Sequence, residues 1–327
     1  MNVAIVGTGW TALELIDILS KHPKFEIKYL SNSSGGQKLT DIYPNLKGVF
    51  DIDIEKTSID DIVLTSSLVF LSVPHKTAMA LVPKLLDGGL KVVDLSADYR
   101  LTLDRYEKNY CPHTDKKNLS NAVYGLPECY SDDIKKTNLI ANPGCYPTAT
   151  ILGLLPFLSY IDDGSPIYID AKSGISGAGK KVNSVTSFAN IQENCFAYNP
   201  LTHRHICEIE QQLKIQSNKD FDINFVPHLI PVYRGMLISI FVKLNQTIDA
   251  TKVLKEYYQE DKFIRIRENP PAIKDNIQTN FCDIFATTNG KYLYINTAID
   301  NLSRGASSQA VLNANLMCGF DDSLGIV

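Results

Sequence analysis

The sequence predicts an α/β protein: a Rossmann-type doubly wound parallel sheet, followed by a second α+β domain on a largely antiparallel sheet. In the first half, short apolar runs alternate with segments whose apolar residues recur at helical spacing, which is typical of a parallel sheet. After Cys145 the pattern becomes rich in strands. The 327 residues suffice for two domains, and 44% hydrophobic with 21% charged residues is ordinary for a globular protein.

Apolar periodicity gives the expected elements in order. The first half should contain strands at 3–6, 25–30, 67–73 and 91–95, with a helix after the glycine turn at 7–12 and another at 76–86. The second half should contain strands at 167–171, 223–227, 236–244 and 292–298, with helices near 206–216 and 250–260. A last helix at 306–317 is expected to return to the first domain.

Composition excludes several classes of protein. The formal net charge of -4 arises from 32 basic and 36 acidic residues, and their interspersion gives no field for nucleic acid or a membrane surface. No apolar stretch is long enough to span a bilayer, and no signal peptide is visible, so we expect a cytoplasmic protein. The seven cysteines are scattered without CxxC spacing, which argues against a disulfide framework and against a metal site.

Cys145 is the first candidate for chemistry. It follows the turn 142–144, and Pro147 is suited to the first position of a helix. On this interpretation the helix starts at Pro147, and the unpaired amides of Thr148 and Ala149 face the sulfur and favour the thiolate. The alternative is a buried structural cysteine at a strand-to-helix junction.

A glycine turn and the loop after the second strand predict a dinucleotide site. The turn matches GxGxxA between a strand and a helix, where backbone amides can approach a pyrophosphate. The loop 31–38 offers hydroxyls, an amide and Lys38, and no acid that would repel a 2′-phosphate, which favours NADP over NAD. The alternative is a polar turn. The expected cofactor-binding residues here are Gly7, Thr8, Gly9, Trp10, Thr11, Ser31, Ser33 and Ser34.

Three further segments carry candidate site residues. His205 and Glu208 share a helix face at i, i+3, so the carboxylate could orient an acid/base imidazole; the alternative is a capping histidine beside a surface glutamate. The glycine-rich loop 170–180 could cradle a phosphate or be merely mobile. Arg100 follows a strand of the parallel sheet and offers a planar fork for a carboxylate or phosphate, with a structural Asp98 pair as the alternative.

Taken together, motifs over nearly the whole chain resemble the N-acetyl-gamma-glutamyl-phosphate reductases, which are NADP-dependent enzymes of arginine biosynthesis. Two motifs depart from the usual family pattern. The opening GASGYTG turn is shortened to GTGWTA, and HRHTPEI reads HRHICEI. The motifs that carry the resemblance are SVPH (72–75), DLSADYRL (94–101), YGLPE (124–128), NPGCYPT (142–148), DAKSGISGAGK (170–180), HRHICEIEQ (203–211), FVPHLIPVYRG (225–235) and DNLSRGASSQAVLNANLM (300–317).

The resemblance implies an NADP-binding Rossmann domain at 1–144, completed by a C-terminal helix at 301–327. A catalytic and oligomerisation domain occupies 145–300, in a dimer or tetramer. It implies Cys145 as nucleophile and an acid/base among 203–205, of which the spacing to Glu208 favours His205. Asn142 would assist the oxyanion. The expected substrate-binding residues are Arg100, His203 and Arg204. The further cofactor-binding residues are Ser72, Pro74, Ser173, Gly174, Gly177 and Asn313.

The implied reaction is reduction of a small-molecule acyl phosphate, N-acetyl-glutamyl 5-phosphate, to the semialdehyde through a cysteine thioester. Three alternatives remain open. They are an aspartate-semialdehyde dehydrogenase, a lysine-pathway reductase whose substrate rides on a carrier protein, and a non-catalytic NADP-binding redox sensor.

Overall fold

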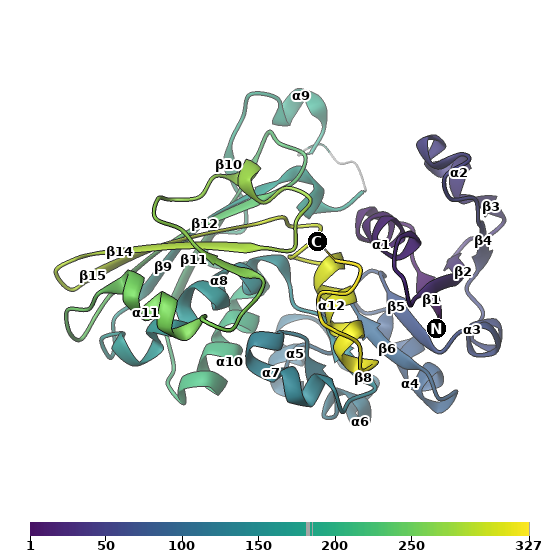
Figure 1. The fold of residues 1–327 in the computed structure, drawn as a ribbon, viewed down its shortest axis with the longest axis horizontal. Coiled ribbons are helices and arrows are strands. Elements are labelled where there is room, and N and C mark those ends of the chain that lie inside the picture. Colours follow the sequence, from purple (N-terminus) through teal and green to yellow (C-terminus); the bar gives the residue numbers. More distant parts are fainter. Residues whose placement is uncertain (181–183, 185, 327) are drawn as a thin grey trace. The chain divides into compact units, whose positions relative to one another are not determined.

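The computed structural model describes residues 1–180, 184 and 186–326, and these divide into two compact units. Unit 1 comprises Met1–Pro143 and Ala306–Val327, and unit 2 comprises Gly144–Gly305. The chain leaves unit 1 immediately before the candidate nucleophile and returns to it just ahead of the last helix. Figure 1 shows the elements along the chain.

Unit 1 is built on an eight-stranded sheet in the order β3-β4-β2-β1-β5-β6-β8-β7, in which only the β3–β4 pair is antiparallel. Its strands are β1 (Asn2–Val6), β2 (Glu26–Asn32), β3 (Gln37–Lys38), β4 (Asp53–Lys56), β5 (Leu68–Leu71), β6 (Lys91–Asp94), β7 (Val123–Tyr124) and β8 (Leu139–Ala141). Its helices are α1 (Trp10–Ser20), α2 (Leu39–Ile42), the 3-10 helix η1 (Pro44–Leu46), α3 (Ile59–Thr65), α4 (Ala78–Asp87), α5 (Leu103–Asn109), α6 (Lys116–Leu119), α7 (Pro127–Ile134) and α12 (Ser307–Met317).

The centre of this sheet is buried on both faces. All four residues of β5 are buried, as expected for a parallel strand covered by helices on each side. α12 packs against α1 and α7, and its eleven residues are all buried, so the C-terminal helix completes unit 1. The predicted Rossmann-type sheet is therefore observed, and the last helix is part of unit 1.

Unit 2 is built on a seven-stranded sheet in the order β10-β11-β9-β12-β15-β14-β13, antiparallel except for the β9–β11 and β13–β14 pairs. Its strands are β9 (Ile167–Gly174), β10 (Phe196–Ala197), β11 (Ile223–Ile230), β12 (Met236–Lys243), β13 (Ile264–Ile266), β14 (Cys282–Asn289) and β15 (Tyr292–Ile299). Its helices are α8 (Cys145–Leu154), α9 (Phe188–Ile191), α10 (His205–Ser217) and α11 (Ala250–Tyr257), with 3-10 helices η2 (Leu155–Tyr160), η3 (Ile175–Ala178) and η4 (Ile273–Asp275).

The long strands of unit 2 alternate between buried and accessible residues. In β11 every second residue is buried, and β12 repeats the pattern, so one face of the sheet is packed and the other is open. α8, α10 and α11 pack against this sheet, and in Figure 1 they lie on the same side of it. The fold class expected from the sequence is confirmed.

Candidate functional site

Cys145 occupies the first position of α8, with Gly144 as the residue before the helix. The expected helix start at Pro147 is wrong by two residues. Pro147 takes the third helical position, where its missing N–H is again one that a helix leaves unpaired. The Thr148 N–H donates to the Gly144 carbonyl at 2.9 Å, so it does not face the sulfur as expected. The positive end of the helix dipole is still at the thiol.

A second helix begins beside the first. His205 is the first residue of α10, and α10 packs against α8. Glu208, one turn later, is 2% exposed, and its carboxylate accepts the Gly144 N–H at 2.8 Å. Glu208 therefore fastens the start of α8, directly before the nucleophile, to the first turn of the helix that carries His205.

Aromatic rings from the two helix starts lie against one another. The Tyr146 ring meets His203 and His205 edge-on, with centroids 5.5 and 5.8 Å away, and the two histidine rings are 4.8 Å apart. His203 Nδ1 accepts the backbone N–H of His205 at 3.2 Å. Burial, with the Arg204 charge adding to it, lowers the pKa of His203 to about 4. At neutral pH His203 is therefore an uncharged acceptor at the start of α10, while Arg204 is exposed.

A pair of tyrosines near Cys145 was not identified from the sequence. The hydroxyls of Tyr146 and Tyr198 are 3.0 Å apart. Burial raises the pKa of Tyr198 to about 12 and the pKa of Tyr146 further, and a charge on Cys145 adds to both shifts. Both phenols therefore stay protonated. The only signal in the sequence is that Tyr146 directly follows the cysteine.

The glycine-rich segment after β9 also lies in unit 2. Ser173 is buried, and its hydroxyl donates to the Gly174 carbonyl at 3.0 Å. A Cβ on Gly174 would stand 2.9 Å from the backbone of Arg234, so this glycine permits a close approach of two loops. Gly177 lies in η3. Their expected role in phosphate binding stays a prediction.

Arg100 lies in unit 1, after β6. It is 6% exposed. Its Nε donates to the Asn142 carbonyl at 2.7 Å and its Nη2 to the Leu95 carbonyl at 2.8 Å. The Asp98 carboxylate accepts the Lys76 N–H at 2.7 Å, in front of α4. Arg100 thus joins the segments that follow β6 and β8.

Two predicted site residues pair with each other in the interior of unit 1. The Asn142 amide nitrogen donates to the Ala306 carbonyl at 3.0 Å, and its oxygen accepts the Asn313 amide at 3.0 Å. Asn313 also donates to the Gly125 carbonyl at 2.8 Å. Both asparagines are buried, so each holds backbone at the end of the parallel sheet.

The glycine turn requires glycine at its first position and is uncrowded at Gly9, before α1. Gly7 has φ 119°, and a Cβ there would stand 2.1 Å from the Ser72 carbonyl oxygen, so only glycine fits. Gly9 precedes α1, and a Cβ there would meet nothing within 4 Å, which leaves the helix N-terminus open to an anion. The Thr11 and Ser72 hydroxyls are 2.6 Å apart.

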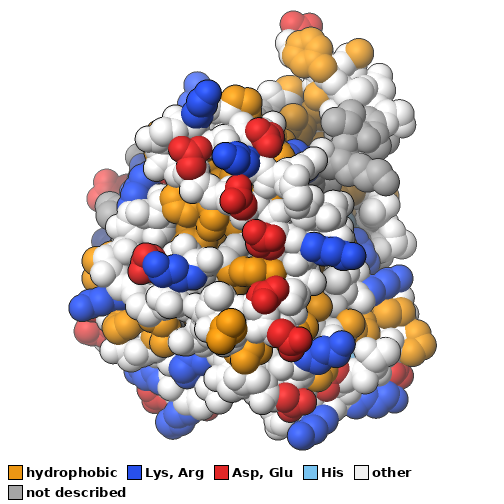
Figure 2. Space-filling view, turned by 90° about the vertical axis from the view of Figure 1, so that its right-hand side faces the viewer, with side chains coloured by type: hydrophobic (Ala, Val, Ile, Leu, Met, Phe, Trp, Pro, Cys, Tyr) orange, Lys and Arg blue, Asp and Glu red, His pale blue; other side chains and the backbone are white. Residues whose placement is uncertain are grey.

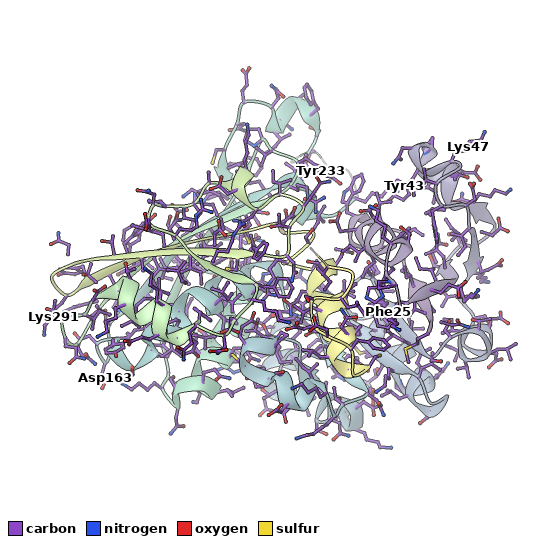
Figure 3. All side chains as sticks on the ribbon, viewed as in Figure 1. Phe25, Tyr43, Lys47, Asp163, Tyr233 and Lys291 are labelled. Atoms are coloured by element: carbon purple, nitrogen blue, oxygen red, sulfur yellow. The ribbon has the colours of Figure 1, made fainter. Side chains whose placement is uncertain are left out.

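Aromatic residues and the loop before α4 flank this turn. The Trp10 ring lies 6.3 Å from that of Tyr43, which is labelled in Figure 3, and the Tyr43 hydroxyl donates to the Thr8 carbonyl at 3.0 Å. Pro74 is exposed between β5 and α4. Trp10 itself, at the start of α1, is half-buried.

The loop after β2 divides its serines between interior and surface. Ser31 is fully buried and its hydroxyl accepts that of Thr57 at 3.2 Å, whereas Ser33 and Ser34 are exposed. The Asn32 side-chain oxygen accepts the Ser34 N–H at 2.9 Å, which shapes the loop. Lys56 of β4 is paired in register with Asn32 and is exposed. Sequence reasoning missed this cation because it lies one strand away.

The candidate residues thus form two groups, one in each unit. Unit 2 brings together Cys145, Tyr146, His203, His205 and Glu208 at the starts of two packed helices. Unit 1 carries the glycine turn, the Ser33 loop and Arg100.

Metal sites and membrane-spanning helices are further features that bear on function. Within residues 1–180, 184 and 186–326, no group of His, Cys, Asp and Glu side chains is arranged to hold a metal ion. No helix in those ranges is long and apolar enough to cross a membrane. The seven cysteines all lie in the described part of the chain, and no disulfide joins any of them. Figure 2 shows basic and acidic side chains interspersed over one face of the molecule, as the sequence indicates.

Comparison with known proteins gives one consistent result. Residues 2–137 match the semialdehyde dehydrogenase NAD binding domain, and residues 145–301 match the semialdehyde dehydrogenase dimerisation domain. The chain is 54% identical over 328 residues to the N-acetyl-gamma-glutamyl-phosphate reductase of Sulfurimonas denitrificans, covering 100% of this chain and 97% of the relative. The corresponding protein of Sulfurovum sp. is 49% identical, covering 100% and 98%.

Solved structures show the same fold at low identity. Aspartate semialdehyde dehydrogenase II from Vibrio cholerae superposes with a TM-score of 0.73 at 17% identity, covering 97% of this chain and 98% of that one. Aspartate semialdehyde dehydrogenase with NADP from Candida albicans gives the same TM-score, identity and coverage.

Proposed function

Because the chain belongs to the N-acetyl-gamma-glutamyl-phosphate reductase family and is an NAD(P)-dependent oxidoreductase, we propose that it reduces N-acetyl-L-glutamyl 5-phosphate to N-acetyl-L-glutamate 5-semialdehyde. Phosphate is released, and the reaction is a step of arginine biosynthesis. The observation that carries the proposal is the placement of Cys145 at the start of α8, next to the start of α10 with His205.

Cys145 acts as the nucleophile. Its sulfur attacks the acyl carbon, the bond from that carbon to the phosphate oxygen breaks, and a thioester forms on the enzyme. The positive N-terminal end of α8 stabilises the negative oxygen of the tetrahedral intermediate, with Asn142 proposed to assist. Hydride addition to the thioester carbon, with a proton on its oxygen, gives a thiohemiacetal, and cleavage of its carbon–sulfur bond releases the aldehyde and regenerates the Cys145 thiolate.

His205 is the general acid and base. It takes the thiol proton, gives a proton to the thiohemiacetal oxygen and accepts it again when that intermediate collapses. His203 is unsuited to this role because a pKa of about 4 leaves it without a proton to donate at pH 7. Its hydrogen bond to the His205 N–H instead supports the start of α10.

The residues of unit 1 fit NADP(H). The Gly7 turn and the open start of α1 suit the pyrophosphate, while exposed Ser33, Ser34 and Lys56 offer hydroxyls and a positive charge to a 2′-phosphate. When bound, the nicotinamide supplies the hydride that reduces the thioester. Arg100 is proposed to help hold the anionic substrate.

The open face of the unit 2 sheet supports a homo-oligomer. Tyr168 and Phe241 are cross-strand neighbours and are 55% and 52% exposed, and the Phe241 ring lies 5.0 Å from that of Tyr294. An aromatic row on an open sheet within a matched dimerisation domain is suited to packing against a second copy of the same sheet. Light scattering on a Phe241→Glu variant tests this, since a retained oligomer would contradict it.

The activity is tested by following reduction of NADP⁺ with N-acetylglutamate semialdehyde and phosphate, beside the same assay with aspartate semialdehyde. We expect turnover with the first substrate only. Cys145→Ser should retain fold and cofactor binding but lose turnover, because a serine hydroxyl stays protonated and attacks poorly. Near-normal kcat in Cys145→Ser would exclude the covalent route. A preference for aspartate semialdehyde would indicate that the protein is an aspartate-semialdehyde dehydrogenase instead.

A further inference from the structure

The loop between β15 and α12 packs directly behind Cys145. A Cβ on Gly305 would stand 2.8 Å from the Cys145 Cβ and 2.7 Å from the carbonyl oxygen of Asn301. Side chains essentially never come so close, so Gly305 allows the backbone of this loop to contact the nucleophile. The position of the segment 301–305 therefore limits where the Cys145 side chain can lie.

Asn301 ties this loop to two others through one buried amide. Its nitrogen donates to the Ser176 hydroxyl at 2.9 Å, and its oxygen accepts the Gly235 N–H at 2.6 Å. The residue is 3% exposed. Ser176 lies in η3 after β9, and Gly235 directly precedes β12, so a single side chain joins three segments that are far apart in the sequence.

The two segments held by Asn301 are themselves joined through the backbone. The Ser176 N–H donates to the carbonyl of Tyr233, labelled in Figure 3, at 3.0 Å, and the Gly174 N–H donates to the Gly235 carbonyl at 2.9 Å. The segments around Ser176 and Gly235 thus support each other at the end of the unit 2 sheet. The Asn301 side chain anchors the 301–305 loop to these two segments.

We propose that Asn301 is a positioning residue for Cys145, holding the 301–305 loop against the nucleophile through Ser176 and Gly235. The inference rests on the proposed role of Cys145. A loop fixed in this way restricts the rotation of the thiol, keeping the sulfur in the field of the α8 N-terminus and in line for attack. Asn301 itself need touch neither substrate nor cofactor.

Two variants of Asn301 separate positioning from charge. Asn301→Ala removes both hydrogen bonds. Asn301→Asp keeps them, since the carboxylate can accept from both the Gly235 N–H and the Ser176 hydroxyl, but it adds a negative charge to the loop behind the thiol. Asn296→Ala is the matched control: it also removes a buried amide, which donates to the Ile238 carbonyl at 2.8 Å.

The control lies on the other face of the same sheet. Ile295 and Thr297 of β15 are the residues nearest to a Cβ on Gly153 of α8, so the intervening Asn296 faces away from that helix. Its loss should lower the stability of unit 2 without altering the support of Cys145, and light scattering on the variant must show the parent oligomeric state because Asn296 shares the face of Phe241 and Tyr294. If Asn301→Ala and Asn296→Ala lose similar amounts of unfolding free energy, any further loss of kcat in Asn301→Ala reports the positioning of Cys145.

Two measurements on full-length enzyme test the proposal. The first is the pH dependence of kcat and KM in the phosphate-dependent assay. The second is the pH dependence of iodoacetamide labelling at Cys145, followed by peptide mapping, which needs neither substrate nor turnover.

For Asn301→Ala we expect a kcat plateau lowered by roughly ten- to a hundredfold, with KM values changed less than about twofold, and a labelling midpoint moved towards that of an ordinary thiol. For Asn301→Asp we expect the rising limb of kcat to move to higher pH while the plateau returns close to that of the parent enzyme. Asn296→Ala should leave both profiles in place.

The proposal is overturned if Asn301→Ala labels at Cys145 with the parent rate and pH profile, or if its kcat falls no further than that of Asn296→Ala. Failure of the proposed function has a different signature, because Cys145→Ser would then retain turnover while the labelling comparison still reports on Asn301.

Discussion

Replacing His203 by asparagine tests whether this histidine is a neutral support or a participant in proton transfer. In the structure its Nδ1 accepts the His205 N–H at 3.2 Å, and burial lowers its pKa from the ordinary 6.5 to about 4. An asparagine oxygen can occupy nearly the same place as Nδ1 and accept the same hydrogen bond. His203→Asn therefore removes the titrating group and keeps the hydrogen bond to the His205 N–H.

The size of the effect follows from proton linkage. Because the folded-state pKa lies below the unfolded-state value, the unfolded chain binds the proton first as the pH falls. The folded state therefore loses stability between about pH 6.5 and pH 4. With these two values, the loss between pH 7.5 and pH 5 is about 2 kcal/mol. At pH 7 roughly one molecule in a thousand carries the proton on His203, which is too few for a general acid.

Urea unfolding at pH 7.5 and pH 5 measures this difference. Far-UV circular dichroism is the appropriate signal, because the single tryptophan, Trp10, lies in unit 1 whereas His203 lies in unit 2. The parent protein should lose about 2 kcal/mol more than His203→Asn between the two conditions, and kcat of the variant should stay within about fivefold of the parent. Equal pH dependence in the two proteins, or a collapse of kcat in the variant, would refute the reasoning.

Three further substitutions give distinct outcomes. His205→Asn should lower kcat by roughly two to four orders of magnitude, the usual contribution of a positioned acid/base; steady-state kinetics showing a smaller loss than in His203→Asn would reverse their roles. Ser33→Asp should lower kcat/KM with NADPH by at least about tenfold and favour NADH, by repulsion of the 2′-phosphate. Arg100→Lys should lower the melting temperature by roughly 4 to 8 °C through two weakened charged hydrogen bonds, and an unchanged KM for phosphate would remove Arg100 from the substrate site.

Periodicity predicted those helices and strands in which apolar residues recur at regular positions. The apolar runs of β1 and β5 and the regular spacing of α12 were all visible in the sequence. The strand β14 was missed, because Asp283 stands at a fully buried position in it. Its charge is met by Arg265 and Arg267, and such a pairing across strands cannot be seen in a linear pattern.

The candidate site also contains residues that the sequence could identify and residues that it could not. Cys145 and His205 could be identified because local motifs mark helix starts. The predicted starting residue of α8 was wrong because a proline is tolerated at any of the first positions of a helix, where N–H groups lack intrahelical partners. Asn301 and Gly305 lay within a quoted motif, but their contacts with Ser176, Gly235 and Cys145 depend on how three loops fold together.

Glu208 shows how a tertiary contact adds to the chemistry that a spacing suggests. The i, i+3 relation to His205 predicts an orienting carboxylate, which stays a prediction, and one oxygen of that carboxylate accepts the Gly144 N–H at the start of α8. A negative charge there fastens the helix, and it also offsets part of the attraction that the helix dipole exerts on a thiolate. The α8 dipole then favours the Cys145 thiolate less than the sequence implied. Removal of the thiol proton therefore depends more on a base, and His205, at the start of the helix that carries Glu208, has the chemistry to be that base.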